Sequence, residues 1–572
     1  MVFLTVVILF AVSAVAPFVR ERMGKAFPLL VAGAPAACAG YFASKFYEVI
    51  QTGKPILSTW EWSQALGMDL AANLDGLSLL FAMLVCGIGA FVMLYATSYM
   101  KGEEKEGRFF AFLGSFMASM LGLVLVDNLL LVFVFWELTS ITSYLLIGWV
   151  HKSADSRKSA LQALVTTGLG GLALLAGLVL LGIAAGTWSI SEIANSPDLV
   201  ERVRESELLP GILVCVLAGC FTKSAQFPFH YWLPNAMAAP TPVSAYLHSS
   251  TMVKAGVFLI ARLNPIFDGV AGWSTTLVIF GGFTMLFAAY MGSRQSILKR
   301  LLAYSTVSSL GLMVFLIGLG SSNHYALYGA MGYLLAHALF KATLFLVAGT
   351  LTHETGEKDI ERLGGLHSVM PMTSWAGFLA ALSMAGVPMF LGFQGKEFLL
   401  KATLEAPKEW VWWLFGVAVI AAIWNVMIGF CVGWKPFRGA LTETKKHPHD
   451  APRPMWIGPI VLAVLALVGG LAPGWFAKPV VEQAVAAVQI RGDHAEPKHD
   501  AEHAETVAFA LIPVAADYPE EHTEGAHHGD GAHAAGHYEV PWTLVELWPT
   551  KAKSWIALMG SLSAIILGIV AY

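Results

Sequence analysis

Ionisable side chains stand within long apolar runs of this 572-residue sequence, where a lipid bilayer would make their charges costly. Glu137 lies in an apolar stretch from Leu131 to Trp149, and Lys223 follows another stretch that starts at Pro210. A lysine partner would keep Glu137 charged, and Lys223 is the obvious candidate. If such a pair opens, the desolvated lysine releases its proton more readily. The two residues therefore predict a switchable proton site.

A second group of candidates lies further along the chain. His337 and Lys341 are four residues apart, so they share one face of a helix and could form a relay step. His248 and Lys254 lie in one apolar segment, and Lys396 follows a run that glycine and proline interrupt. A lysine at a helix end can instead reach the lipid headgroups, and a histidine can be a hydrogen-bonded member of a helix bundle. Both alternatives stay open.

Two prolines mark expected helix breaks. Pro228 and Pro388 interrupt apolar runs in comparable places of two halves, and proline removes a backbone donor. Paired interruptions of this kind are typical of inverted-repeat transporters with sites near the membrane midplane, although a kink in a helix bundle is the alternative. Asp75, His230 and Lys299 are secondary candidates, since Asp75 could cap a helix and Lys299 could anchor a helix end.

The composition sets the protein class. Hydrophobic residues make up 56% of the chain, charged residues 13%, and the mean hydropathy is +0.64, which predicts an all-α polytopic membrane protein. A span needs about 20 apolar residues. On that rule we expect about fifteen spans, near 2–19, 27–45, 74–98, 109–126, 128–150, 160–185, 209–229, 239–262, 272–291, 302–319, 325–350, 371–399, 409–433, 455–474 and 553–571.

The short loops give an orientation. Basic residues gather in alternate loops, which places the amino terminus outside and the loop at 435–453 inside. The first segment, Met1–Val19, lacks a basic leader and a cleavage motif, so we interpret it as a retained span in the cell (inner) membrane.

Several kinds of site are not expected. The five cysteines lie in apolar runs without CxxC spacing and are typical of small core residues. No Walker motif, dinucleotide fingerprint or Cys/His metal cluster occurs, so no cofactor and no metal site is expected. The net charge of −4 is too close to neutral to indicate nucleic acid as a partner.

One tract departs from the membrane pattern. Residues His494–His537 hold eight of the seventeen histidines, interleaved with acidic residues, glycine and alanine. Such a tract cannot bury a core, so it is expected to be an extramembrane loop, within about residues 491–540. Metal capture or proton buffering there is an open hypothesis, although no ligand spacing appears.

The chain resembles the antiporter-like family that includes the large subunits of Mrp-type Na+/H+ antiporters and the proton-pumping subunits of complex I and membrane-bound hydrogenases. The resemblance covers about Asp75 to Pro473 and rests on VFWELTSITSYLLIGW, TKSAQFPFHYWLPNAMAAPTPVSAYLHSSTMVKAG, LLAYSTVSSLG, HALFKATLFLVAG and GFQGKEFLL. HETGEKDIERLGGL and TTGLGGLALLAG are most similar to the MrpA-type branch.

The resemblance implies a division into N-terminal helices (1–108), two antiporter repeats (109–262 and 263–434) and C-terminal helices (435–572). It implies that Glu137 and Lys223 form the key ion pair. It further implies a proton route that continues through His248, Lys254, His337, Lys341 and Lys396. Mrp-type large subunits usually carry a further carboxy-terminal group of spans, to which a sodium route is often assigned, whereas this sequence stops at Tyr572 after one helix. The resemblance therefore leaves open whether the sodium route lies in this chain or on a separate subunit.

Three functions follow as hypotheses. The first is a secondary transporter subunit, not an enzyme, that moves protons against sodium or another cation together with other membrane subunits. The second is the proton-pumping subunit of a complex I-like or hydrogenase-like redox complex, which co-purifying iron–sulfur subunits would reveal. The third is a metal-binding surface protein that acts through the histidine-rich tract.

Overall fold

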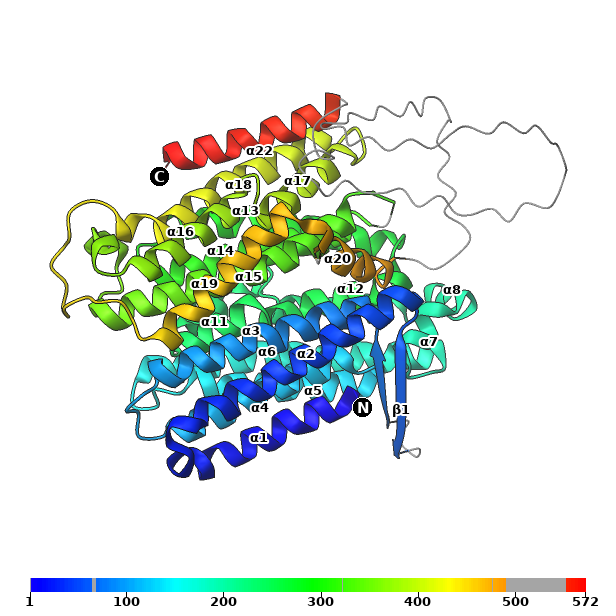
Figure 1. Ribbon diagram of the computed structural model, residues 1–572. Helices are drawn as coiled ribbons and strands as arrows, with labels where there is room; N and C mark the ends of the chain where they lie inside the picture. Colours follow the sequence, from blue (N-terminus) through cyan, green and yellow to red (C-terminus); the bar gives the residue numbers. More distant parts are fainter. Residues whose placement is uncertain (1, 64–67, 321, 476, 490–551, 572) are drawn as a thin grey trace, which may run out of the picture. The chain divides into compact units, whose positions relative to one another are not determined.

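The computed structural model describes residues 2–63, 68–320, 322–475, 477–489 and 552–571, and this part is dominated by long helices (Figure 1). The expected histidine-rich loop lies outside the described residues. Ten described segments are long and apolar enough to cross a membrane, and the first of them, Val2–Thr52, contains two helices in succession. The expected class, a polytopic helical membrane protein, is confirmed.

The first half of the chain begins with two helices, a β-hairpin and six further helices. Their bounds are α1 (Val2–Met23), α2 (Phe27–Thr52), β1 (Ile56–Ser63), β2 (Met68–Leu74), α3 (Gly76–Tyr99), α4 (Glu106–Leu125), α5 (Leu129–Ile147), α6 (Ala154–Ala185), α7 (Ile190–Asn195) and α8 (Pro197–Glu205).

The remaining helices are α9 (Leu209–Lys223), α10 (Trp232–Asn235), α11 (Thr241–Ser249), α12 (Ala255–Phe267), α13 (Ala271–Ser293), α14 (Leu298–Gly318), α15 (Ala326–Thr355), α16 (Pro371–Ala385), α17 (Leu391–Leu404), α18 (Val411–Gly433), α19 (Arg453–Leu471), α20 (Ala477–Ala486) and α22 (Ala552–Ala571).

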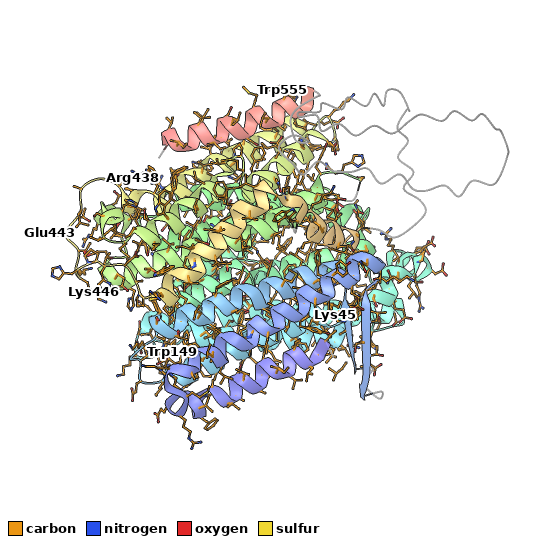
Figure 2. The ribbon with its side chains drawn as sticks, viewed as in Figure 1. Lys45, Trp149, Arg438, Glu443, Lys446 and Trp555 are labelled. Carbon is orange, nitrogen blue, oxygen red and sulfur yellow. The ribbon has the colours of Figure 1, made fainter. Side chains whose placement is uncertain are left out.

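The hairpin of β1 and β2 was not predicted. Its strands are antiparallel, with Ile56 opposite Leu74 and Leu57 opposite Asn73. Hydropathy windows sized for membrane helices do not detect strands this short, which explains the omission. The hairpin, α7, α8 and α20 lie at the same end of the bundle in Figure 1, which we call the hairpin end. Figure 2 shows Arg438, Glu443 and Lys446 at the opposite end.

Two expected spans are interrupted. The segment predicted at 239–262 consists of α11 and α12, and the segment predicted at 371–399 consists of α16 and α17. A third departure concerns the segment predicted at 209–229, because α9 ends at Lys223 and α8 meets α9 at an angle of 99°. Short helices that end inside a bundle leave backbone groups without helical partners, which polar side chains can then use.

An ion pair joins α3 to α12 at the hairpin end. Asp75 caps α3 by accepting a hydrogen bond from Ser78 N at 3.0 Å. Both carboxylate oxygens of Asp75 accept hydrogen bonds from Arg262, whose Nη2 lies 3.0 Å from Oδ1 and 2.7 Å from Ser78 Oγ. Asp75 and Arg262 are both buried. Asp75 is therefore a helix cap and a structural ion partner.

We expect Arg262→Met to destabilise the protein strongly, because it leaves the Asp75 carboxylate buried without its counter-charge. Removing one partner of a buried pair costs about 3–5 kcal/mol. Thermal unfolding of the detergent-purified protein measures the effect.

The matched control is the double variant Asp75→Asn with Arg262→Met, which removes both charges and keeps a side-chain oxygen for the cap. It should unfold at a higher temperature than Arg262→Met alone. Equal loss in the two variants would contradict the assignment of Arg262 as the counter-charge of Asp75.

Candidate functional site: a buried line of ionisable groups

Lys223 is the last residue of α9 and is fully buried. Its Nζ donates hydrogen bonds to Trp136 O at 3.0 Å and to Ser140 Oγ at 2.7 Å, both on α5. The same nitrogen lies 5.1 Å from the centroid of the Trp136 ring. Lys223 is therefore held by neutral oxygens and by an aromatic face, which stabilise a cation without cancelling its charge.

Glu137, also on α5, is a neighbour of Lys223 but is not hydrogen-bonded to it. The charges of the two groups act on each other, yet no ion pair between them is present, and Glu137 Oε1 is buried without a hydrogen-bond partner in the described part of the chain. The structure thus brings the expected partners together and shows the pair open.

One glycine of α6, Gly171, makes room for Glu137. A Cβ atom added at Gly171 would lie 1.9 Å from Glu137 Oε1, closer than any two such atoms can approach. One turn earlier, Gly168 has nothing within 4 Å of the same added atom. The Glu137 carboxylate therefore occupies the space that a side chain at Gly171 would fill, whereas Gly168 does not contact it.

The first interrupted helix presents Lys254. α11 ends at Ser249, and Lys254 closes a short 3-10 turn before α12 begins. Lys254 is fully buried, and its Nζ donates to Leu334 O of α15 at 2.9 Å. This break at 250–254 was not among the predicted ones. The predicted Pro228 instead lies in the connection after α9, before the 3-10 turn of Phe229–Tyr231.

The second interrupted helix presents Lys396. Pro388 lies between α16 and α17, where it was predicted, and Gly386 ends α16 with a φ of +79°. Lys396, on α17, donates a hydrogen bond of 3.0 Å from its Nζ to the carbonyl oxygen of Ala385, which is the last residue of α16. The carbonyl groups at a helix carboxyl end carry partial negative charge, so they suit an ammonium group. Each interrupted helix thus places one lysine against a backbone carbonyl oxygen.

The long helix α15 lies between these breaks and carries two further predicted residues. Every residue in its most apolar window is buried. Lys341 bonds to Ser305 Oγ of α14 and lies 3.7 Å from Met384 Sδ of α16. Neither ring nitrogen of His337 makes a hydrogen bond of good geometry within the described residues, while the Ser249 backbone and the charges of Lys254 and Lys341 act on its ring.

His248, on α11, is fully buried, and neither ring nitrogen has a hydrogen-bond partner in the described ranges. Its ring centroid lies 6.1 Å from that of Phe345 on α15. Lys299 acts on it electrostatically and donates to Ala239 O at 2.6 Å. We call Glu137, Lys223, His248, Lys254, His337, Lys341 and Lys396 the line. Lys299 acts on His248, a member of the line, so it lies nearer to these groups than a lysine that only anchors a helix end at the lipid headgroups would.

The other secondary candidates lie elsewhere. His230 packs against the rings of Phe227 and Phe287, with centroid distances of 5.7 and 5.0 Å. Asp75 belongs to the ion pair with Arg262. Sequence reasoning missed Arg262 because it counted that residue within an apolar span, although an arginine in such a run is itself a signal.

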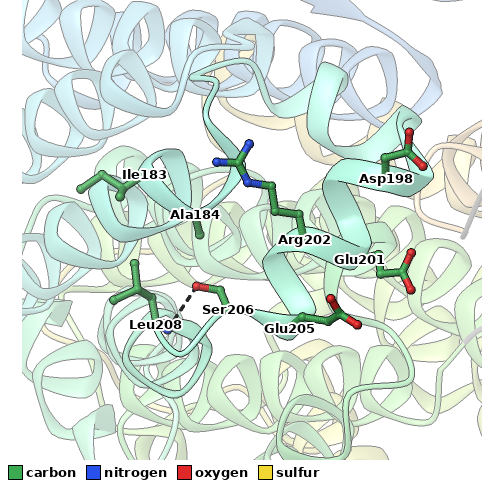
Figure 3. Close-up of a pocket in the computed structure, with 8 residues that line it drawn as sticks. All are labelled: Ile183, Ala184, Asp198, Glu201, Arg202, Glu205, Ser206 and Leu208. Carbon is green, nitrogen blue, oxygen red and sulfur yellow. Dashed lines mark hydrogen bonds between the residues drawn. The ribbon is translucent and has the colours of Figure 1, made fainter.

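Two polar features at the hairpin end share no residue with the line. Asp127, between α4 and α5, accepts hydrogen bonds from the hydroxyl groups of Ser189 and Ser191 at 2.7 and 2.6 Å. Burial raises the pKa of Asp127, and these hydrogen bonds act in the opposite direction. An open hollow of about 550 Å³ lies between α6 and α8. Asp198 and Arg202 are among the residues that line it (Figure 3).

The fold and the site together define the class of protein. It is a polytopic membrane protein in which interrupted helices place ionisable side chains inside the helix bundle. The family model described as NADH:quinone oxidoreductase/Mrp antiporter, TM matches residues 126–422, and the model of the complex I chain 5 amino terminus matches residues 60–110. The chain belongs to this antiporter-like family. The resemblance stated from the sequence is confirmed.

Curated relatives are similar over most of this chain. A Na(+)/H(+) antiporter subunit from Alkalihalophilus pseudofirmus is 42% identical over 467 residues, which is 78% of this chain and 58% of the relative. A probable K(+)/H(+) antiporter subunit from Rhizobium meliloti is 40% identical over 501 residues, 85% of this chain and 49% of the relative. The chain thus spans about half the length of these relatives.

Two solved structures share the fold. A chain in the Mrp complex from Dietzia sp. DQ12-45-1b superimposes with a TM-score of 0.81 at 32% identity, over 100% of this chain and 55% of that chain. A chain of an archaeal membrane-bound sulfane sulfur reductase superimposes with a TM-score of 0.73 at 23% identity, over 86% of this chain and 98% of that chain. The second similarity concerns the fold alone.

Proposed function

We propose that this chain is the proton-translocating subunit of a multisubunit cation/proton antiporter, with sodium as the cation. The observation that carries the proposal is a set of buried lysines held by neutral oxygen atoms, at the end of α9 and in and between the two interrupted helices, together with histidines whose ring nitrogens lack hydrogen-bond partners in the described residues. The names of the relatives support it, since several are called Na(+)/H(+) antiporter subunits.

The proposed route uses the line in chain order. Its members are Glu137, Lys223, His248, Lys254, His337, Lys341 and Lys396. The line holds four lysines and a single carboxylate, and burying ammonium groups without matching counter-charges is costly, so the lysines cannot all hold a proton at once. A proton that arrives at one lysine is therefore expected to displace the proton of its neighbour. Contacts that support this are the electrostatic links of His337 with Lys254 and Lys341, and of Lys341 with Lys396.

Glu137 sets the state of the first lysine. When the carboxylate approaches Lys223 it stabilises the ammonium form, and when the pair opens, as in this structure, the lysine can pass its proton on. A membrane potential supplies about 2.3 kcal/mol per elementary charge per 100 mV, enough to shift such equilibria. The chain acts here as part of a secondary transporter and performs no catalysis of its own.

The remaining assignments follow from this function. The partners are other membrane subunits of the antiporter, the lipid bilayer, protons and sodium ions, and the location is the cell (inner) membrane. The hairpin end faces outside. Residues 109–262 and 263–434 form two inverted repeats, each with one interrupted helix, flanked by N-terminal helices (1–108) and C-terminal helices (435–572).

A redox-driven proton pump is the second candidate, because both matching family models carry the name of a quinone oxidoreductase. In that case the same line would take its energy from electron transfer in other subunits. Purification of the assembly separates the two candidates, since iron–sulfur subunits would accompany a redox pump and would be missing from an antiporter.

We expect Lys223→Ala to reduce cation/proton exchange to less than about a tenth of the wild-type rate, a barrier increase of at least about 1.4 kcal/mol. The variant removes the group that Glu137 controls. Exchange is measured in membrane vesicles as the collapse of a pH gradient after sodium addition.

Lys152→Ala is the matched control, because Lys152 is an exposed lysine outside the line. It should exchange at the wild-type rate. Wild-type exchange in a correctly assembled Lys223→Ala complex would contradict the proposed function.

We expect Gly171→Ala to slow exchange by at least about fivefold while the protein stays folded, because the new methyl group displaces the flexible end of Glu137 and not the backbone. Gly168→Ala, on the same helix, should leave exchange unchanged. The measurement is the vesicle assay together with thermal unfolding. Equal exchange rates in Gly171→Ala and Gly168→Ala would contradict the proposal that exchange depends on the position of the Glu137 carboxylate.

A further inference from the structure

The part of α17 beyond Lys396 carries a second set of charged residues. Glu397, Lys401 and Glu405 follow one another at intervals of four, so they lie along one face of the helix. Glu397 is fully buried, Lys401 is 5% exposed and Glu405, which ends the helix, is exposed. The row therefore leads from the interior to the surface.

The buried end of this row is held by the last helix of the chain. Glu397 Oε2 accepts a hydrogen bond from Ser561 Oγ of α22 at 3.0 Å. Glu397 Oε1 lies 4.0 Å from Lys401 Nζ and has no hydrogen-bond partner in the described part of the chain. A buried carboxylate oxygen without a donor is costly, and protonation removes that cost.

The exposed end of the row is at the hairpin end. Glu405 Oε2 accepts a hydrogen bond from His324 N at 3.2 Å, in the connection between α14 and α15. Lys401 Nζ lies 5.5 Å from the centroid of the Tyr325 ring, and the charge of Glu405 acts on it. Lys401 thus stands between two carboxylates, one buried and one in contact with solvent.

Helix α22 packs closely on α17 and α18, as Figure 1 shows. A Cβ atom added at Gly560 would lie 2.7 Å from the ring of Phe415, and one added at Gly568 would lie 2.5 Å from Val426 Cβ. These glycines let α22 approach, and Ser561 follows directly after Gly560. The hydroxyl group that holds Glu397 is therefore part of a close helix contact.

We propose that Glu397, Lys401 and Glu405 form a proton route from Lys396 to the membrane surface at the hairpin end, and that α22 closes this route through Ser561. The inference rests on the proposed function. Lys401 first releases its proton to Glu405, which gives it to solvent. Glu397 then takes the proton of Lys396 and passes it to the neutral Lys401 amine. One proton leaves the protein, and Lys396 is reprotonated from the line.

The decisive variant is Lys401→Arg in the intact assembly. Arginine keeps the positive charge between Glu397 and Glu405 but does not release its proton, so a structural role survives and a relay role does not. We expect the complex to assemble with wild-type thermal stability and to exchange at less than about a tenth of the wild-type rate.

Ser561→Ala tests the closure. Loss of the hydrogen bond frees Glu397, and we expect the sodium-independent leak of protons to increase by about fivefold. Ser563→Ala, two residues further along α22, is the matched control and should leave the leak unchanged. An equal leak in both variants would overturn the role of α22.

Lys223→Ala is measured beside these variants. An inactive Lys223→Ala together with wild-type exchange in Lys401→Arg would overturn the route and leave the proposed function intact. Wild-type exchange in Lys223→Ala would overturn the proposed function and the route with it.

Discussion

Buried ammonium groups that are bound to neutral oxygen atoms are the constraint on which this structure depends. Lys223, Lys254 and Lys396 each donate to a backbone carbonyl oxygen inside the bundle. Lys223 and Lys254 bond to carbonyl oxygens in the middle of α5 and α15, whose second lone pair can still accept, whereas Lys396 uses the last carbonyl group of α16, which has no helical partner. The interruption after Ala385 leaves the carbonyl end of α16 for Lys396, so breaking the helix creates the binding position.

Two kinds of charge arrangement occur in the same bundle. Asp75 and Arg262 form a closed pair in which both carboxylate oxygens and Ser78 take part. Glu137 and Lys223 are neighbours that do not bond. A closed buried pair is difficult to separate and therefore suits a structural role, whereas an open pair can change its protonation at lower cost. The difference in geometry separates a structural ion pair from the proposed proton site.

Small residues determine where these groups have room. Gly171 on α6 leaves space for the Glu137 carboxylate, and Gly560 lets α22 bring Ser561 to Glu397. In a lipid bilayer the hydrophobic effect does not favour association between helices. Close packing at small residues and polar contacts between helices stabilise the bundle instead. The same glycines thus stabilise the bundle and position the ionisable groups.

The sequence by itself determined the helical membrane class, most of the spans, the break at Pro388 and the burial of Lys223, His248, His337 and Lys341. These are local properties, since hydropathy and proline act within one segment. Only the tertiary structure decided which atoms the charges meet, including Leu334 O for Lys254, Arg262 for Asp75 and Ser561 for Glu397. Those contacts join residues 80 to 187 positions apart, and their formation depends on how the helices pack, which no single segment encodes.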